Sequence, residues 1–159
     1  MKDIYSFLES NNLAYDRHDH KAVFTVEESK IYSPDLDGTS TKNLFLRDKK
    51  GTRHFLVTLH EDKNVDLKEL SYKLDSSRLS FASPERLKKY LGIEPGSVSL
   101  LALANDEMKN VEAYIDKDIW DDKSILCHPL INTSTLVINI RDMEKFLKIT
   151  GHGTNLIDL

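Results

Sequence analysis

Lys42 and Asn43 are the first side chains in this sequence whose position suggests chemistry. They follow a polar, turn-forming stretch and directly precede an apolar segment at residues 44–46. A lysine at the mouth of a buried sheet is partly removed from water, so an anionic ligand would stabilise its charge. A solvated surface lysine fits the same spacing. From these residues alone both interpretations stay open.

Two further polar loops precede apolar segments. Gly96 follows Pro95 and offers backbone N–H groups that could bind a carbonyl or a carboxylate, although a plain loop leading into a strand has the same pattern. Asn132 and Thr133 form the second loop, and the alternative there is a turn in which short polar side chains bond to the backbone. Nothing in the sequence alone brings these loops together.

The histidines and the cysteine argue against a metal or thiol centre. His18 and His20 would share one face of a strand, because side chains alternate along it, but no third ligand stands at a recognisable spacing. Cys127 and His128 are adjacent and would point to opposite faces of an extended chain. We therefore expect Cys127 to be a small buried residue. No P-loop, dinucleotide fingerprint or zinc-protease motif is present, so no metal and no cofactor is expected.

The elements that must position these residues follow from hydrophobic periodicity and capping signals. Apolar runs at 44–46 and 55–59 flank a polar turn that ends at Gly51, which predicts a β-hairpin. Helices are expected at residues 1–11, from 25 to before 34, at 65–74, at 84–91 and at 142–149. Further strands are expected at 15–19, 98–103, 111–115, 136–140 and 156–157. Irregular alternation of this kind indicates an α+β fold, a single domain over residues 1–159 with a mixed, mostly antiparallel sheet and packed helices.

Length and charge restrict the partners. The chain has 159 residues, one cysteine and a net charge of −4. No apolar run approaches the roughly 18 residues that a bilayer crossing requires, and the charged start is unlike an export signal, so we expect a cytoplasmic protein without a membrane partner. A protein that binds nucleic acid unaided normally carries an excess of basic residues. This chain has no such excess, so DNA binding is disfavoured and any contact with RNA would be local, weak or assisted by a second protein.

Several long segments resemble the YbaK/ProX-type aminoacyl-tRNA editing family. The segments are residues 41–51, 92–99, 127–133 and 20–28. The resemblance spans nearly the whole chain in the same order and spacing. The nearest branch is that of the freestanding ProX-like deacylases acting on tRNA for proline, especially those that remove alanine. The proline that usually follows the first family histidine is replaced here by Lys21.

The resemblance implies an α+β enzyme that hydrolyses the ester between a wrong amino acid and the tRNA 3′ end. Lys42 matches the key lysine of the family, Asn43 its neighbour, and residues 128–130 the His-Pro-Leu loop. Gly96 matches the glycine of a Gly-x-x-x-Pro loop, in which Leu100 here replaces the proline. Backbone N–H groups near such a glycine could stabilise the developing oxyanion.

Roles for individual residues follow from the same resemblance. The expected catalytic residues are Lys42, Gly96 and His128, and the expected substrate-binding residues are Asn43, His20, Ser97, Asn132 and Thr133. Lys42 would hold the phosphate or ribose of the tRNA end by its charge, and His128 would contact the terminal sugar or position water. The resemblance further implies that the vicinal hydroxyl of the substrate activates the water.

The expected partners are a tRNA acceptor end carrying a wrong amino acid and, as a hypothesis, a prolyl-tRNA synthetase that delivers it. A synthetic site for proline rejects the smaller alanine poorly, because each missing methylene is worth only about 1–3 kcal/mol, so a second hydrolytic site adds the discrimination. Two alternatives stay open. One is a non-catalytic module that binds tRNA or synthetase, suggested by Leu100, and the other is a deacylase for Cys- or Ser-charged tRNA. Basic groups near Lys50 and Lys89 would follow the acceptor stem or form a solvated face.

Overall fold

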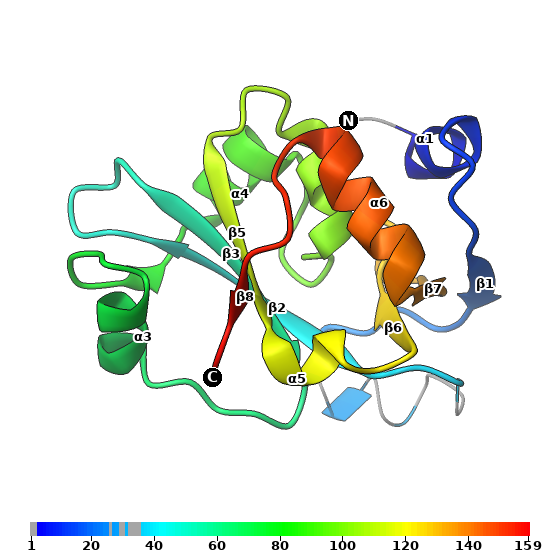
Figure 1. The fold of residues 1–159 in the computed structure, drawn as a ribbon, viewed down its shortest axis with the longest axis horizontal. Helices are drawn as coiled ribbons and strands as arrows, with labels where there is room; N and C mark the ends of the chain where they lie inside the picture. Colours follow the sequence, from blue (N-terminus) through cyan, green and yellow to red (C-terminus); the bar gives the residue numbers. More distant parts are fainter. Residues whose placement is uncertain (1–2, 26, 29–30, 32–35) are drawn as a thin grey trace.

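Two β-sheets and the helices packed on them form the part of the chain that the computed structural model describes, residues 3–25, 27–28, 31 and 36–159 (Figure 1). A five-stranded sheet has the order β4-β2-β3-β5-β8, and a three-stranded sheet has the order β1-β7-β6. The strands are β1 (Asp16–Asp19), β2 (Thr41–Arg47), β3 (His54–His60), β4 (Ser80–Phe81), β5 (Val111–Asp116), β6 (Ser124–Cys127), β7 (Ser134–Asn139) and β8 (Leu156–Ile157). In the larger sheet β3 runs antiparallel to β2 but parallel to β5, which confirms the expected mixed α+β architecture.

The hairpin predicted from the sequence is the centre of the larger sheet. β2 and β3 pair without interruption from Thr41 opposite His60 to Arg47 opposite His54. Asp48 closes the turn, because its carboxylate accepts hydrogen bonds from the backbone N–H groups of Thr52 and Arg53. β3 is buried along nearly its whole length, as expected for a strand covered on both faces.

The helices begin and end where capping chemistry places them. They are α1 (Ile4–Ser10), α3 (Leu67–Lys73), α4 (Pro84–Leu91), α5 (Lys117–Trp120), α6 (Ile140–Thr150) and the 3₁₀ helix η1 (Leu100–Asn105). α4 has the predicted bounds: the Ser83 hydroxyl accepts the Arg86 N–H, and Gly92 ends the helix with a φ of 67°. No helix among the described residues is long and apolar enough to cross a bilayer.

Only part of the helix expected from Thr25 lies within the described residues. The backbone N–H of Glu28 donates to the Thr25 hydroxyl at 3.1 Å, as the predicted capping box requires. Residues 27, 28 and 31 are helical. Positions 26, 29–30 and 32–35 are outside the described residues.

The strand expected at residues 98–103 is wrong. Leu100–Asn105 forms η1 instead, and the Ser99 hydroxyl caps it by accepting the Leu101 N–H. Every side chain from Leu100 to Ala104 is buried. An apolar run that is buried on all sides has no periodicity to separate strand from helix, and that is why the prediction failed. The glycine loop therefore leads into a helix, with Leu100 at its first position.

Two apolar clusters lie on opposite faces of the larger sheet. The main cluster joins Phe45 of β2 and Leu56 of β3 to η1, α4, α6 and the three-stranded sheet. The smaller one packs Leu46 and Phe55 against Leu70 of α3. Figure 1 shows α3 at one end of the molecule and the β1-β7-β6 sheet with α6 at the other. Cys127 is buried in the main cluster, as predicted, and burial raises the pKa of its thiol to about 12.

A buried hydrogen bond fastens the segment after α6 to the turn after η1. His152 Nε2 lies 2.8 Å from Asp106 Oδ2, and both side chains are 2% exposed. Asp106 also accepts the backbone N–H groups of Asn110 and Val111. Burial acts to raise the pKa of Asp106, but these hydrogen bonds outweigh it and hold the pKa below its ordinary value of 3.8.

We expect Asp106→Ala to lower the free energy of unfolding by about 3 kcal/mol, because it leaves His152 and two backbone donors unpaired in the interior. The folded-state pKa of Asp106 is depressed, so this contribution is present above the unfolded value and is lost as pH falls through the folded one. Urea unfolding at pH 7 and near pH 3 measures both effects. Glu144→Ala, an exposed acid on α6, is the control and should change little. Equal stability of Asp106→Ala and wild type would contradict the prediction.

Candidate functional site

Residues 20–24 lie along the loop that precedes β7. The backbone N–H of His20 donates to the Thr133 carbonyl at 2.9 Å, and that of Val23 to the Asn132 carbonyl at 3.3 Å. The Asn132 side-chain amide returns a hydrogen bond to the Val23 carbonyl at 2.8 Å. Asn132 thus holds two segments together that are more than 100 positions apart. The Thr133 side chain is exposed.

Gly96 touches both of these segments. Its φ is +88°, a conformation that favours glycine, and a Cβ built on it would lie 3.1 Å from Phe24 Cδ1 and 3.8 Å from Asn132 Nδ2. Phe24 is 67% exposed, so its ring lies against this glycine and faces solvent. We call Phe24, Gly96 and Asn132 the loop junction. Within the described residues three polar segments meet there.

Asn43 connects the loop junction to the larger sheet. Its side-chain amide donates to the Val98 carbonyl at 3.3 Å, and its side-chain oxygen accepts the Thr58 hydroxyl at 2.6 Å. One position earlier in the loop, the Ser97 N–H donates to the Glu94 carbonyl at 3.1 Å, and Ser97 itself is buried. The carboxamide of Asn43 therefore fixes the position of the glycine loop relative to β2 and β3.

Two histidine rings lie beside the loop junction with centroids 6.3 Å apart, His20 and His128. His20 Nε2 lies 2.8 Å from the Thr135 hydroxyl. His128 Nδ1 lies 3.0 Å from the Ser134 carbonyl, which can only accept, so Nδ1 carries the proton and Nε2 presents a lone pair. Burial lowers the pKa of His128, the bond to Ser134 opposes this, and His20 lowers it further. His128 is therefore a neutral hydrogen-bond acceptor at pH 7.

The loop that carries His128 is held in an unusual backbone conformation. Leu130 has a φ of +69°, which is rare for a branched apolar residue, and its side chain is buried. Burial of the Leu130 side chain in the main cluster maintains this conformation. Such positions are found where a chain must present a neighbouring side chain at a fixed angle.

Lys42 is half-buried on β2, and its ammonium group forms no hydrogen bond or ion pair with a described residue. The regular pairing of β2 places the side chains of Lys42 and Leu44 on one face and that of Asn43 on the other. Leu44 packs in the smaller cluster, and Phe45 in the main one. The structure thus joins Asn43, Gly96, Asn132, His20 and His128 through contacts. Lys42 lies on the opposite face of β2, and no contact among the described residues connects its side chain to them.

Phe24 is the residue that reasoning from the sequence missed. It directly precedes the Thr25 capping box, where an apolar residue is typical of the hydrophobic staple that packs on its own helix. Its exposure beside Gly96 depends on a contact between positions 72 residues apart, which no local pattern indicates. Groups of three or more metal-ligating side chains are absent among the described residues.

Comparison with known proteins identifies the family. The model of the aminoacyl-tRNA editing domain matches residues 20–146, which include every residue of the site. The prolyl-tRNA editing protein ProX of Acetoanaerobium sticklandii is 38% identical over 152 residues, covering 96% of this chain and 93% of that protein. Prolyl-tRNA synthetase associated domain-containing protein 1 of Danio rerio is 37% identical over 153 residues, covering 95% and 83%.

Solved structures agree on the fold. The chain superposes with a TM-score of 0.73 on the crystal structure of hypothetical protein APE2540, at 16% identity and 97% coverage of both chains. It superposes with a TM-score of 0.70 on a crystal structure described as a candidate trans-editing enzyme for prolyl tRNA synthetase, at 18% identity and 98% and 94% coverage. The family match and the curated relatives, with this fold, define an aminoacyl-tRNA editing domain. The chain belongs to the aminoacyl-tRNA editing domain family, in its YbaK/ProX branch, and is a hydrolase that deacylates tRNA.

Proposed function

We propose that this protein removes a wrongly attached small amino acid from tRNA for proline, with Ala-tRNA(Pro) as the preferred substrate, and that it acts in trans. The observation that carries the proposal is the meeting of the glycine loop, the His128 loop and residues 20–24 at one place. The names of the relatives from Acetoanaerobium sticklandii and Danio rerio support the choice of prolyl-tRNA.

Gly96 would stabilise the oxyanion through the backbone. The Ser97 N–H is already donated to the Glu94 carbonyl, whereas the N–H groups of Gly96 and Val98 have no acceptor among the described residues. Free backbone donors in a fixed loop can point at the oxygen on which charge develops when water attacks the ester. Asn43 acts through this loop, because its amide holds the Val98 carbonyl, and is a positioning residue in this scheme.

His128 would accept a hydrogen bond from the attacking water or from a hydroxyl of the terminal ribose. Its Nε2 lone pair is available because Nδ1 donates to the Ser134 carbonyl. The exposed ring of Phe24 next to Gly96 offers a surface on which the terminal base can stack. His20 and Thr133 fix the edge of the same loop, and the unpaired ammonium of Lys42 would hold a phosphate of the tRNA end from the other face of β2.

We expect His128→Ala to lower kcat/KM for deacylation about tenfold. This loss is smaller than the loss expected when a hydrogen-bond donor that stabilises the oxyanion is removed. Because the pKa of His128 is lowered from 6.5, protonation should remove its acceptor only at pH values below that, so wild-type activity falls on the acid side. Deacylation rates from pH 5 to 8 measure this, and the acid limb should be lost in His128→Ala. His60→Ala, which removes a half-buried histidine at the end of β3, should retain both rate and profile. An unchanged rate in His128→Ala would remove this residue from the site.

The substrate is tested directly with tRNA(Pro) charged with alanine, cysteine, serine or proline. We expect alanine to be released fastest and proline to be retained. Faster release of cysteine or serine would support the alternative amino-acid specificity. No release of any of them would favour the non-catalytic binding module. Adding prolyl-tRNA synthetase to the same assay tests delivery, since a synthetase that hands over tRNA should lower the KM and leave kcat unchanged.

A further inference from the structure

A second candidate binding site lies at the other end of the molecule, between α3 and residues 76–79. The cavity there has a volume of about 570 Å³, within the roughly 300–1,000 Å³ typical of small-molecule sites. Figure 1 shows α3 on the side of the larger sheet away from β1, β6 and β7, which carry the histidine loops. We call it the α3 cavity. None of the residues that line it belongs to the loop junction.

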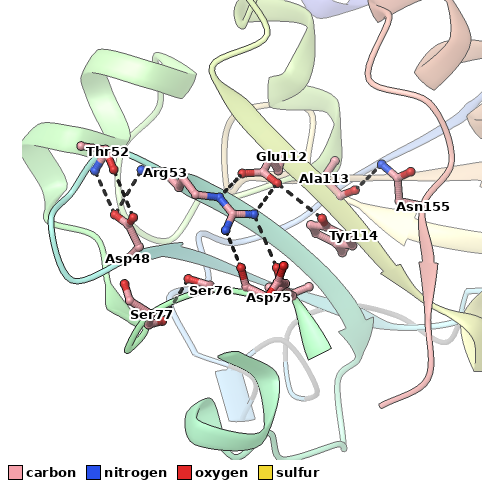
Figure 2. Close-up of polar contacts among 11 residues, drawn as sticks. Asp48, Thr52, Arg53, Asp75, Ser76, Ser77, Glu112, Ala113, Tyr114 and Asn155 are labelled. Atoms are coloured by element: carbon pink, nitrogen blue, oxygen red, sulfur yellow. Dashed lines mark hydrogen bonds and ion pairs between the residues drawn. The ribbon is translucent and has the colours of Figure 1, made fainter. Parts of the chain in front are cut away.

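The wall of the α3 cavity is held in place by the larger sheet. Arg53 of β3 donates to the Asp75 carbonyl at 2.8 Å and pairs with Glu112 of β5 at 2.9 Å (Figure 2). This fixes Asp75 at a φ of +51°, from which the chain turns into residues 76–79. The Ser77 hydroxyl also accepts the Lys49 N–H at 3.1 Å. These bonds hold the wall of the cavity in place, so the cavity is preformed before a ligand binds.

The lining combines an apolar floor, an exposed aromatic ring and two free cations. Leu67 and Leu79 form the floor, and Tyr72 is 72% exposed at the rim. Neither Lys68 nor Arg78 forms an ion pair or a side-chain hydrogen bond with a described residue, and no carboxylate lines the cavity. An exposed aromatic ring binds a flat ring by stacking, and two cations that line one cavity can bind an anion such as phosphate.

Three basic side chains near Lys50 and Lys89 already have partners within the protein. Arg53 binds Glu112, Arg86 donates to the Gly51 carbonyl at 3.1 Å, and Lys88 pairs with Glu94 at 3.0 Å. The two cations of the α3 cavity differ from these because their charges are unused within the described protein. Both side chains are exposed and line the cavity, so an anionic ligand there can pair with them without displacing a protein partner.

We propose that the α3 cavity binds a nucleotide, with the base stacked on Tyr72 over the apolar floor and the phosphate between Lys68 and Arg78. The nucleotide is either free or part of the tRNA chain, and the chemistry of recognition is the same for both. The proposal is independent of deacylation, because it rests on the lining of this cavity alone.

Adenosine 5′-monophosphate is the probe, titrated into the ¹⁵N-labelled full chain and followed by NMR. We expect saturable shifts of amides in residues 67–79, separate from any shifts near Gly96. The double variant Lys68→Ala/Arg78→Ala should raise the Kd of adenosine 5′-monophosphate, measured from these shifts, at least tenfold. Adenosine, which lacks the phosphate, should bind the wild-type cavity correspondingly weakly. Tyr72→Ala should weaken both ligands, whereas Tyr72→Phe keeps the ring and should not. Arg141→Ala/Lys145→Ala on α6 removes the same charge and should change nothing.

Deacylation assays separate the two sources of the nucleotide. If the cavity takes a nucleotide of the tRNA, Lys68→Ala/Arg78→Ala raises the KM for aminoacyl-tRNA several-fold with kcat unchanged, and the monophosphate competes. If it takes a free nucleotide, the KM is unaffected while the NMR titration responds. Absence of saturable shifts in residues 67–79 of the wild type, together with an unchanged KM, would overturn the proposal. The wild-type titration requires neither a variant nor an active enzyme, so it also distinguishes failure here from failure of the proposed function.

Discussion

Lys42→Ala should lower kcat/KM for deacylation about 100-fold or more while the protein stays folded. The side chain makes no hydrogen bond or ion pair with a described residue, so its removal costs the fold little. If its ammonium neutralises a phosphate of the tRNA end during the reaction, a 100-fold loss corresponds to about 2.7 kcal/mol of transition-state stabilisation. Single-turnover deacylation measures the loss of activity, and a thermal melt measures whether the variant stays folded.

The matched control for this prediction is Lys50→Ala. Lys50 lies in the turn at the opposite end of the same hairpin, is exposed and carries the same charge. If only Lys42→Ala loses deacylation activity, the effect comes from the position of Lys42 and not from the change in net charge. Binding through a phosphate also predicts a salt-dependent KM, whose slope should fall by about one in Lys42→Ala. Wild-type activity in that variant would show that the ammonium takes no part, and the phosphate role would be abandoned.

Gly96→Ala is expected to lower deacylation about 50-fold. An added Cβ at 3.1 Å from the Phe24 ring must displace that ring, and a φ of +88° is strained for alanine. Either change moves the free N–H groups of the loop relative to the ester, and misplacement by about 1 Å can cost 100-fold in rate. The measurement is kcat/KM with the best substrate, with unfolding followed in parallel.

Gly153→Ala separates backbone strain from loss of the site. Gly153 has a φ of +72° and nothing within 4 Å of its ideal Cβ, so alanine there meets the same backbone strain, about 1–2 kcal/mol, without a new contact. We expect both variants to lose similar stability and only Gly96→Ala to lose activity. Equal activities in the two variants would show that the glycine loop does not take part in the reaction.

Features that depend on neighbouring residues were predictable from the sequence. Ser83, Pro84 and Gly92 fixed both ends of α4, because a cap, a preset φ and a left-handed stop act within one turn of the helix. The hairpin of β2 and β3 followed from two apolar runs around a polar turn with glycine at its end. The short strand β6 and the helix α5, by contrast, were not predicted, since four residues give too little periodicity.

Within the candidate site, residue types were predictable and their arrangement was not. The resemblance selected Asn43, Gly96, His128 and Asn132. The structure connects Asn43, Gly96 and Asn132 through hydrogen bonds and contacts between distant segments, and it places the His128 ring beside that of His20. The tautomer of His128 depends on the Ser134 carbonyl, and burial of the ring sets the direction of its pKa shift. Neither property is contained in the sequence around position 128.

The sequence by itself determined the bounds of α4, the hairpin of β2 and β3, the absence of a strong basic surplus and the family, because composition, caps and motif spacing are properties of short stretches of chain. Tertiary structure alone decided that residues 100–105 form a 3₁₀ helix and that Phe24 lies on Gly96. It also decided that Lys42 and Asn43 use opposite faces of β2 and that Lys68 and Arg78 share a cavity. The physical reason is burial and packing: the free energy of each arrangement comes from contacts between residues far apart in the chain, which no local pattern encodes.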